Sequence, residues 1–332
     1  MILEESQTKQ TTAKMTMRAA VLVAPGKMSV QEVPIPEPAA DQVRIRVERC
    51  GVCASNIPTW EGRPWFTYPL EPGALGHEAS GIIDALGENV QGWQVGQRVA
   101  ALSYNGYAEY DIANANTLVA VPKEIGGWPF LGEPLGCALN IFKRSQIRAG
   151  QTVAIIGAGF LGALLIQLAT RAGARVLALS VRKYSLDVAE SLGAIPIPSE
   201  DRYAAIEQVK SLTNGEFCPV VIEATGKQEP LHLAGELTAV RGRLVIAGYH
   251  QDGMREINLQ LWNWRGIDVI NAHERDENIY VEGMREALAA TLAGDIDPKP
   301  LVTHFLPLEE LPLALELTAN RPNGFLKAVV MP

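Results

Sequence analysis

The sequence predicts an α/β protein that combines a β-rich region with a doubly wound parallel sheet. Short strand patterns separated by Gly, Pro and Asn fill the first ~130 residues, for example at 18–23, 43–47, 81–86 and 98–102. Strand and helix patterns then alternate between residues 153 and 248. Such alternation is typical of parallel strands joined by right-handed helical crossovers.

The alternating region can be divided into individual elements by its apolar runs. We expect strands at 153–157, 176–180, 220–224 and 244–248, and helices at 160–172, 185–192 and 228–239. A last strand at 326–331 is expected to return to the β-rich region.

Composition limits the class of protein. The chain has 332 residues, 47% of them hydrophobic and 20% charged, which suits two folded domains. Its net charge of −8 argues against nucleic acid as a partner, because a phosphate-binding face must be basic. The polar residues 1–16 predict a disordered tail with no signal-peptide pattern.

Two further patterns bear on location. The apolar stretch 153–169 is interrupted by three glycines, so a strand, a turn and a helix explain it better than a membrane span. The four cysteines are too few and too scattered for a disulfide scaffold. We therefore expect a cytoplasmic protein without membrane contact.

A glycine-rich turn follows the strand at 153–157. Gly157, Gly159 and Gly162 fit G-x-G-x-x-G where an apolar strand meets a helix, which is the context that dinucleotide binding requires. The first glycine permits a tight turn, the second lets the backbone approach a pyrophosphate, and the third lets the helix pack closely. Phe160 and Leu161 are expected to line this site at the helix N-terminus. An ordinary glycine-rich turn is the alternative.

The end of the next strand indicates which dinucleotide binds. Where NAD-binding proteins place an acid for the ribose 2′-hydroxyl, this chain has Ser180, followed by Arg182 and Lys183. These residues could bind a 2′-phosphate, so NADP(H) is predicted over NAD(H), which stays possible. The two cations could instead form a solvated helix start. Thr225 and Gly248, at later strand ends, are expected beside the cofactor.

Three separate segments carry residues that suit a catalytic zinc site. Cys53, His77 and Glu133 supply one thiolate, one imidazole and one carboxylate, and such a site leaves a fourth position open. Cys50 and Cys53 could alternatively be a redox pair or half of a zinc ribbon, but the chain has no second C-x-x-C. Alone, His77 would more often be structural, and Glu133 before Pro134 could be a simple acid in a loop.

In this order and spacing, the motifs resemble those of the medium-chain dehydrogenase/reductase superfamily, in its zinc-containing alcohol and polyol dehydrogenase branch. The resemblance covers nearly everything after residue 17. The segments that carry it are Gly51-Val52-Cys53-x-Ser55, Gly76-His77-Glu78-x-x-Gly81, Gly87 to Val99, Glu133-Pro134-Leu135, the glycine turn, and Glu223-Ala224-Thr225-Gly226.

The resemblance implies a domain plan. A GroES-like catalytic domain would comprise residues 17–140 and 298–332, and a Rossmann cofactor domain would comprise residues 141–297. Relatives with a structural zinc carry four close cysteines in a lobe that corresponds to residues 101–123, which contain none. We therefore expect one catalytic zinc and no structural zinc.

The resemblance also assigns roles at the metal. Cys53 and His77 take ligand positions, and Glu133 lies where polyol dehydrogenases carry a glutamate at the metal. Glu78 corresponds to an outer or exchanging ligand in relatives, and Cys137 is the rival third ligand.

Further roles concern the proton. Ser55 matches the hydroxyl that passes the alcohol proton outward. The usual aspartate is Asn56 here and its usual arginine partner is Lys327, which suggests that the pair changed together. Pro58 replaces the relay histidine, so proton release is expected through Ser55, the cofactor ribose and water, or Glu133.

These observations lead to a hypothesis of reversible hydride transfer between a nicotinamide and the carbinol carbon of a secondary alcohol, a polyol, sugar or cyclitol. Aromatic residues at 60–68 could line its pocket or simply pack. A zinc-free NADPH-dependent quinone or alkene reductase and a non-catalytic NADPH-binding structural protein are the alternatives. An apolar segment at 267–271 predicts an edge strand that pairs two chains, giving a homodimer or homotetramer.

Overall fold

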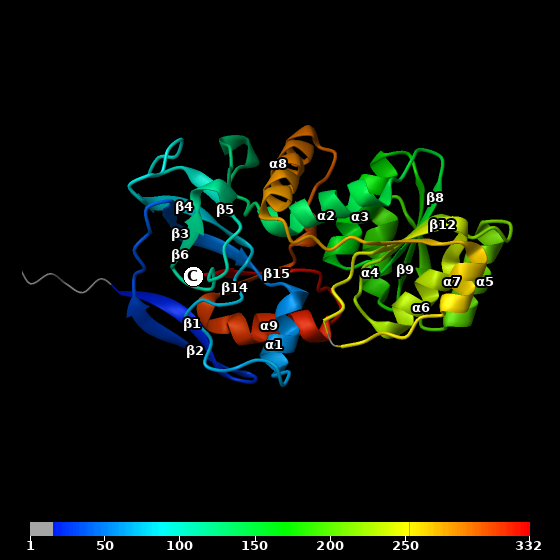
Figure 1. Cartoon of the computed structure of the whole chain (residues 1–332), viewed down its shortest axis with the longest axis horizontal. Coiled ribbons are helices and arrows are strands. Elements are labelled where there is room, and N and C mark those ends of the chain that lie inside the picture. The colour runs from blue at the N-terminus through cyan, green and yellow to red at the C-terminus, as the bar shows by residue number, and fades with distance from the viewer. Residues whose placement is uncertain (1–15, 252) are drawn as a thin grey trace, which may run out of the picture.

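The computed structural model describes residues 16–251 and 253–332. A β-rich domain and an α/β domain lie side by side along the long axis of the molecule (Figure 1). The predicted two-domain α/β fold is confirmed. The predicted tail lies outside the described residues except for Thr16, which begins the first strand instead.

The β-rich domain is built from two sheets. Its strands are β1 (Thr16–Ala24), β2 (Lys27–Pro34), β3 (Gln42–Gly51), β4 (Ala79–Leu86), β5 (Arg98–Ala101), β6 (Tyr110–Asn114), β7 (Leu118–Ala120), β14 (His304–Pro307) and β15 (Ala328–Met331). Strands β1 and β2 form a hairpin, and the others form a sheet of order β14-β15-β3-β4-β5-β7 in which β6 also pairs with β3. Because β15 pairs antiparallel with β3, the predicted return of the last strand is confirmed.

The α/β domain holds one parallel sheet of order β10-β9-β8-β11-β12-β13. Its strands are β8 (Thr152–Ile156), β9 (Arg175–Ser180), β10 (Ile195–Pro198), β11 (Cys218–Glu223), β12 (Thr238–Ile246) and β13 (Asp268–Asn271). The order reverses direction at β8, which places the carboxyl ends of β8, β9 and β11 at the crevice where such sheets bind ligands.

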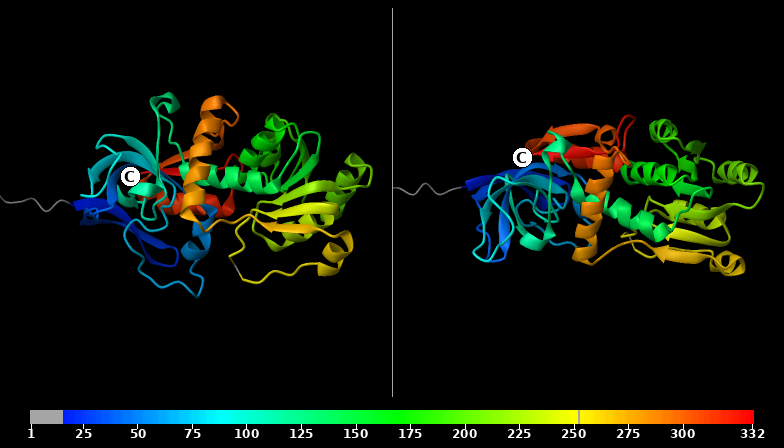
Figure 2. Two further views of the ribbon diagram at one scale, coloured as in Figure 1. Left: turned by 45° about the horizontal axis from the view of Figure 1, so that its top comes forward. Right: turned by 90° about the horizontal axis from the view of Figure 1, so that it is seen from above.

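Helices cover both faces of this sheet and connect it to the β-rich domain (Figures 1 and 2). The α-helices of the described residues are α1 (Ile57–Glu61), α2 (Gly132–Ser145), α3 (Phe160–Arg171), α4 (Lys183–Ser191), α5 (Arg202–Leu212), α6 (Gln228–Leu237), α7 (Leu259–Arg265), α8 (Glu277–Ala293) and α9 (Leu311–Asn320). Of these, α1 and α9 lie in the β-rich domain (Figure 1). The sequence predicted helices only where α3, α4 and α6 lie; the other helices were not predicted.

Helices α2 and α8 pack unusually closely where the two domains join. A Cβ atom on Gly136 would lie 2.8 Å from the backbone nitrogen of Met284, and one on Gly283 would lie 2.8 Å from the carbonyl oxygen of Gly136. Glycine is needed at both positions because any side chain would separate the helices. This contact fixes the first turn of α2, which carries Glu133.

The apolar stretch at 153–169 forms β8, the glycine turn and most of α3, as predicted. Among the described residues, no helix is both long and apolar enough to cross a membrane. Cys50, Cys53, Cys137 and Cys218 are all free thiols.

Candidate active site

Two strand ends of one sheet meet at the predicted metal site. In the antiparallel pair of β3 and β4, Cys50 lies opposite Ala79, so the residues just after β3 and just before β4 are neighbours. Cys53 is two residues beyond β3, and His77 and Glu78 directly precede β4. The pairing of the strands therefore brings these segments together, although they are more than 20 residues apart in sequence.

The side chains converge as well as the backbones. Cys53 Sγ, a ring nitrogen of His77 and a carboxylate oxygen of Glu78 all lie within 4.8 Å of one another. Burial alone would lower the pKa of His77, but its contact with the Cys53 thiol and the nearby Glu133 and Glu78 carboxylates raise it to about 10. The surroundings of His77 are thus strongly favourable to a cation.

Glu78 is fully buried and reaches the cluster past a glycine. A Cβ atom on Gly51 would lie 1.8 Å from Glu78 Oε2, so only glycine leaves room for this carboxylate. Lys327 Nζ lies 2.6 Å from Oε1, to which it donates a hydrogen bond. The same nitrogen is also 2.6 Å from Oε2, but that oxygen has no hydrogen bond of acceptable geometry. Oε2 is therefore held by the charge of Lys327 alone, without a hydrogen bond.

Lys327 comes from the C-terminal segment, one residue before β15. Burial opposes its charge, but the Glu78 carboxylate and its neighbours raise the pKa of Lys327 above its usual value. Its ammonium also lies 5.1 Å from the ring centroid of Phe160 on the glycine turn. The expected pairing of Lys327 with Asn56 is wrong, because Lys327 binds Glu78.

Asn56 has a different role. Its Nδ2 donates hydrogen bonds to O of Leu75 (3.1 Å) and to the hydroxyl of Tyr107 (2.7 Å). The Tyr107 hydroxyl donates in turn to O of Gly51 (3.2 Å). Asn56 therefore ties the loop that carries Cys53 to the loop that carries His77.

Glu133 lies beside the cluster, in the first turn of α2. It does not join Cys53, His77 and Glu78 in the close group, but it interacts electrostatically with His77 and Glu78. Burial raises the pKa of Glu133, and Cys137 Sγ donates to its Oε1 at 3.2 Å. Cys137 thus contacts Glu133 from the next turn of α2.

The other residues that the sequence singled out, Ser55, Cys50 and the aromatics at 60–68, differ in how deeply they are buried. Ser55 is half-buried in the turn after Cys53, and its carbonyl oxygen accepts a hydrogen bond from Gln251 Nε2 of the α/β domain (3.0 Å). Cys50 is buried in the hydrophobic core, where burial raises the pKa of its thiol. Of the aromatic residues at 60–68, Trp60 packs in the same hydrophobic core as Cys50, whereas the side chain of Trp65 is exposed to solvent.

The glycine turn has the geometry that each glycine predicts. Gly157 has a φ of +99°, and a Cβ there would lie 2.5 Å from Cγ2 of Thr225. A Cβ on Gly162 would lie 2.0 Å from O of Gly157, so α3 packs directly on the turn. Gly159, by contrast, has only the Arg182 guanidinium near its Cβ position, at 3.9 Å. The backbone at Gly159 is open to a ligand.

A buried carboxylate holds the neighbouring turn at Thr225. Glu223 Oε1 accepts hydrogen bonds from the backbone nitrogens of Thr225 (2.7 Å) and Gly226 (3.0 Å). Its Oε2 lies 2.9 Å from Nε2 of His250. A Cβ on Gly248 would lie 2.1 Å from the nitrogen of Gly226, so these two strand ends are in contact. The sequence motif contained Glu223, but its role as a support was not predicted.

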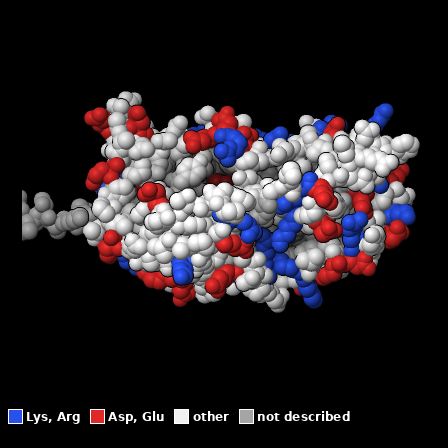
Figure 3. Space-filling view, turned by 60° about the horizontal axis from the view of Figure 1, so that its bottom comes forward, with Lys and Arg blue, Asp and Glu red and all other residues white. Residues whose placement is uncertain are grey.

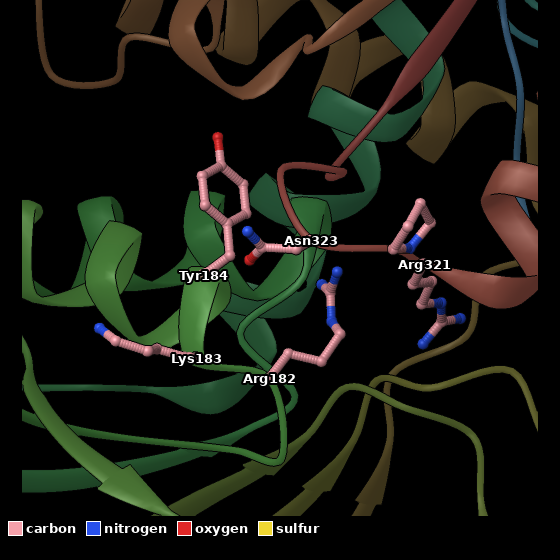
Figure 4. A pocket seen from close by; sticks show the side chains of 6 residues that line it. Arg182, Lys183, Tyr184, Arg321 and Asn323 are labelled. Carbon is pink, nitrogen blue, oxygen red and sulfur yellow. The ribbon is translucent and has the colours of Figure 1, made fainter.

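The cation-rich end of β9 borders a small cavity. Ser180 Oγ accepts a hydrogen bond from the backbone nitrogen of Arg182 (3.1 Å). Arg182 and Lys183 line a cavity of about 190 Å³ together with Tyr184, Arg321, Pro322 and Asn323. In Figure 4, Lys183 points away from the two arginines, and it pairs with Asp187 at 2.7 Å. Basic side chains also gather where the two domains meet on the face shown in Figure 3.

A sheet crevice with a glycine turn, next to a cluster of possible metal ligands, defines a two-domain dehydrogenase. Comparison with known families agrees: residues 39–138 match the alcohol dehydrogenase GroES-like domain, and residues 161–289 match the zinc-binding dehydrogenase family. The chain belongs to the medium-chain dehydrogenase/reductase superfamily, in the branch of zinc-type alcohol and polyol dehydrogenases. It is an oxidoreductase.

Individual relatives cover almost the whole chain. It is 27% identical to a sorbitol dehydrogenase of Bacillus subtilis (strain 168), over 97% of this chain and 99% of the relative. The alcohol dehydrogenase TADH of Thermus sp. ATN1 superposes with a TM-score of 0.80 at 28% identity, covering 95% and 99% of the two chains. A protein of Sinorhizobium meliloti 1021 whose crystal structure contains NADP superposes with a TM-score of 0.81 at 27% identity, covering 96% and 100%.

Proposed function

We propose that this oxidoreductase is a zinc-dependent, NADP(H)-preferring dehydrogenase that interconverts a secondary alcohol and its ketone. The observation that carries this proposal is the convergence of Cys53, His77 and Glu78 beside the glycine turn. One thiolate, one imidazole and one carboxylate form a donor set typical of catalytic zinc. When bound, zinc would act as a Lewis acid toward the substrate oxygen.

The geometry favours Glu78 over Glu133 as the third ligand. Glu78 belongs to the close group and its Oε2 is buried without a hydrogen bond, whereas Glu133 stands outside that group. We assign to the Glu133 carboxyl, which is buried beside the cluster, the exchange of a proton with the substrate hydroxyl or the orientation of that hydroxyl. This assignment exchanges the two roles that the sequence suggested.

The other residues of the site have supporting roles. Ser55 lies two residues after Cys53 and is proposed to pass the alcohol proton toward water. Phe160 connects the two halves of the site, because its ring contacts Lys327 while its backbone starts α3. NADP(H), when bound, would accept or supply the hydride, and the chain provides its position and its electrostatic surroundings.

The preference for NADP(H) is supported by the end of β9. Ser180 stands where a carboxylate would repel a 2′-phosphate, and Arg182 and Lys183 add positive charge. The similar Sinorhizobium protein has NADP in its crystal structure. Ser180→Asp should therefore raise the Kd for NADPH at least tenfold relative to that for NADH, because a new carboxylate would face the phosphate.

The substrate class rests on the relatives. Within the predicted class of polyols, sugars and cyclitols, the similar sorbitol dehydrogenase of Bacillus subtilis supports a polyol. A buried acid beside the metal site, Glu133, suits a substrate that presents several hydroxyl groups.

We also propose that two chains pair through β13, because β13 is one of the two edge strands of the parallel sheet in the described part of the chain. Val269 on this strand is 40% exposed, and Trp264 on the preceding helix is 87% exposed. Light scattering should show a dimer or a tetramer at micromolar concentration. A monomer would refute this pairing.

The experiment that tests the function combines metal analysis with turnover. The purified chain should contain close to one zinc, and it should oxidise at least one polyol, sugar or secondary alcohol, faster with NADP than with NAD. Less than ~0.2 zinc per chain after gentle purification would overturn the zinc assignment. Reduction of quinones or activated alkenes by a zinc-free protein would favour the reductase alternative.

A further inference from the structure

A hydrogen bond connects the α/β domain directly to the turn that holds Ser55. Gln251, which follows the end of β12 by five residues, donates from Nε2 to the carbonyl oxygen of Ser55 at 3.0 Å. The two residues are 196 positions apart in the chain, and Ser55 lies in a short 3-10 helix (Ala54–Asn56) directly after Cys53. A residue of the cofactor domain therefore contacts the backbone at the hydroxyl to which proton transfer is assigned.

The residue next to Gln251 is anchored at both nitrogens of its ring. His250 Nε2 lies 2.9 Å from Oε2 of Glu223, and Arg255 Nε donates to His250 Nδ1 at 3.0 Å. A guanidinium group can only donate, so Nδ1 accepts, and the neutral ring carries its proton on Nε2 and donates it to the carboxylate. With both nitrogens engaged, His250 serves as an anchor rather than as a base toward the substrate.

Arg255 closes these contacts into a ring around the turn at Gly226. Its Nη2 donates to O of Gly226 at 3.0 Å, and the nitrogen of Gly226 donates to Oε1 of Glu223 at 3.0 Å. The side chain of Glu223 is fully buried, and that of His250 is only 14% exposed. Hydrogen bonds to charged groups are strong in such surroundings, so the ring fixes the backbone from which Gln251 extends.

The turn at Ser55 is thus held from two directions. Within its own domain, the neighbouring Asn56 is hydrogen-bonded to Leu75 and to Tyr107. From the other domain, Gln251 holds the Ser55 carbonyl oxygen. The direction of the Ser55 hydroxyl follows from the backbone that carries it, and a displacement of about 1 Å is enough to slow a step that depends on alignment.

We propose that Gln251 is a positioning residue for proton transfer. Anchored through His250, it holds the turn so that the Ser55 hydroxyl keeps the orientation that the transfer requires. The inference rests on the proposed function, because it takes Ser55 as the group that passes the alcohol proton. Since Gln251 acts through the backbone of Ser55, it affects the rate of turnover and not the binding of zinc or of the dinucleotide.

Kinetics of alcohol oxidation by the full-length protein, together with NADPH titration, test this role. Gln251→Met keeps the length of the side chain but removes the donor. It should lower kcat about fivefold to tenfold, the size expected for one hydrogen bond, and leave the zinc content and the Kd for NADPH within twofold. The solvent deuterium isotope effect on kcat should increase, because proton transfer becomes slower. Gln208→Met, at an exposed glutamine on α5, makes the same change and should leave kcat within twofold.

Two further sets of variants separate positioning from general stability. His250→Phe removes both hydrogen bonds of the ring and should reproduce the loss in kcat. His250→Gln should recover part of it, because the amide can donate to Glu223 and accept from Arg255. In a Ser55→Ala protein, Gln251→Met should lower kcat less than twofold, since no hydroxyl is left to position.

The outcomes distinguish this inference from the proposed function. If Gln251→Met leaves kcat within twofold while the wild-type chain oxidises an alcohol, the inference is wrong and the proposed function stands. An equal loss with and without the Ser55 hydroxyl, or a Kd for NADPH that rises as much as kcat falls, also overturns the inference. A wild-type chain that oxidises no alcohol overturns both. If the thermal unfolding midpoint shows that a His250 variant is misfolded, Gln251→Met, which keeps the ring intact, still decides.

Discussion

The metal cluster and the arginine cavity are organised in opposite ways. The cluster is formed within one domain by strand ends of a single sheet, and it holds an excess of acidic and thiol groups around one lysine. The cavity lies where two domains meet and contains two arginines without carboxylate partners. The cluster therefore offers ligand atoms for a cation, whereas the cavity offers positively charged side chains.

The largest effect should follow from removing the thiolate of the cluster. Cys53→Ser should lower kcat/KM at least a thousandfold, equivalent to about 4 kcal/mol, because a weaker ligand replaces the thiolate. Steady-state kinetics and zinc analysis of the same samples measure this. Cys137→Ser is the matched control, since Cys137 contacts Glu133 outside the close group and its loss should leave zinc bound. Loss of zinc from the control would make Cys137 a ligand.

The buried pair of Lys327 and Glu78 should dominate the stability of the metal-free protein. Lys327→Met should lower the free energy of unfolding by about 3 to 4 kcal/mol, because it leaves a buried carboxylate unpaired. Lys143→Met removes a comparable but half-exposed ion pair, with Glu286, and should cost less than about 1 kcal/mol. Urea unfolding of both variants without metal measures the difference. Equal losses would contradict the special role of Lys327.

A second buried acid of the catalytic domain should give stability a pH dependence. Burial raises the pKa of Asp111 from its ordinary value of 3.8 to about 6. The folded chain keeps this proton while the unfolded chain releases it, so the free energy of unfolding should fall as pH rises from about 4 to about 6, by up to about 3 kcal/mol.

Asp111→Asn should flatten that part of the profile, since the amide does not titrate. Asp41→Asn, at an exposed aspartate, should leave the profile unchanged. Urea unfolding across this pH range is the measurement. An unchanged slope in Asp111→Asn would show that other groups cause the dependence.

Substitution of one of two glycines should perturb the metal cluster or the cofactor site separately. Gly51→Ala should displace the Glu78 carboxylate and weaken zinc binding at least tenfold, because its Cβ would overlap Oε2. Gly159→Ala meets no close atom of the protein, so it should keep zinc but weaken NADPH binding about tenfold by obstructing the ligand. Chelator competition and NADPH fluorescence titration measure the two affinities. If Gly51→Ala affects only NADPH, the assignment of Glu78 is wrong.

Local patterns predicted much of the fold and only part of the site. The alternation of strands and helices and the glycine turn depend on neighbouring residues, and the structure has both where they were expected. Cys53 and His77 could be found because each sits in a short motif. The close position of Glu78 depends on the pairing of β3 with β4, which no local pattern reveals.

Residues contributed by distant segments were the hardest to predict. Lys327 reaches Glu78 only because β15 returns to pair with β3, and the sequence assigned it to Asn56 instead. Arg321 lies in no recognisable sequence motif. It lines a cavity together with Arg182, which lies about 140 residues earlier in the chain. Tertiary contacts of this kind follow from how the domains pack.

Zinc K-edge X-ray absorption of the purified enzyme tests the central claim most directly. The proposed ligands Cys53, His77 and Glu78 predict a zinc ion with a single sulfur neighbour at about 2.3 Å and nitrogen or oxygen neighbours at about 2.0 to 2.2 Å. A protein without zinc, or a zinc ion with two sulfur neighbours, would contradict the account.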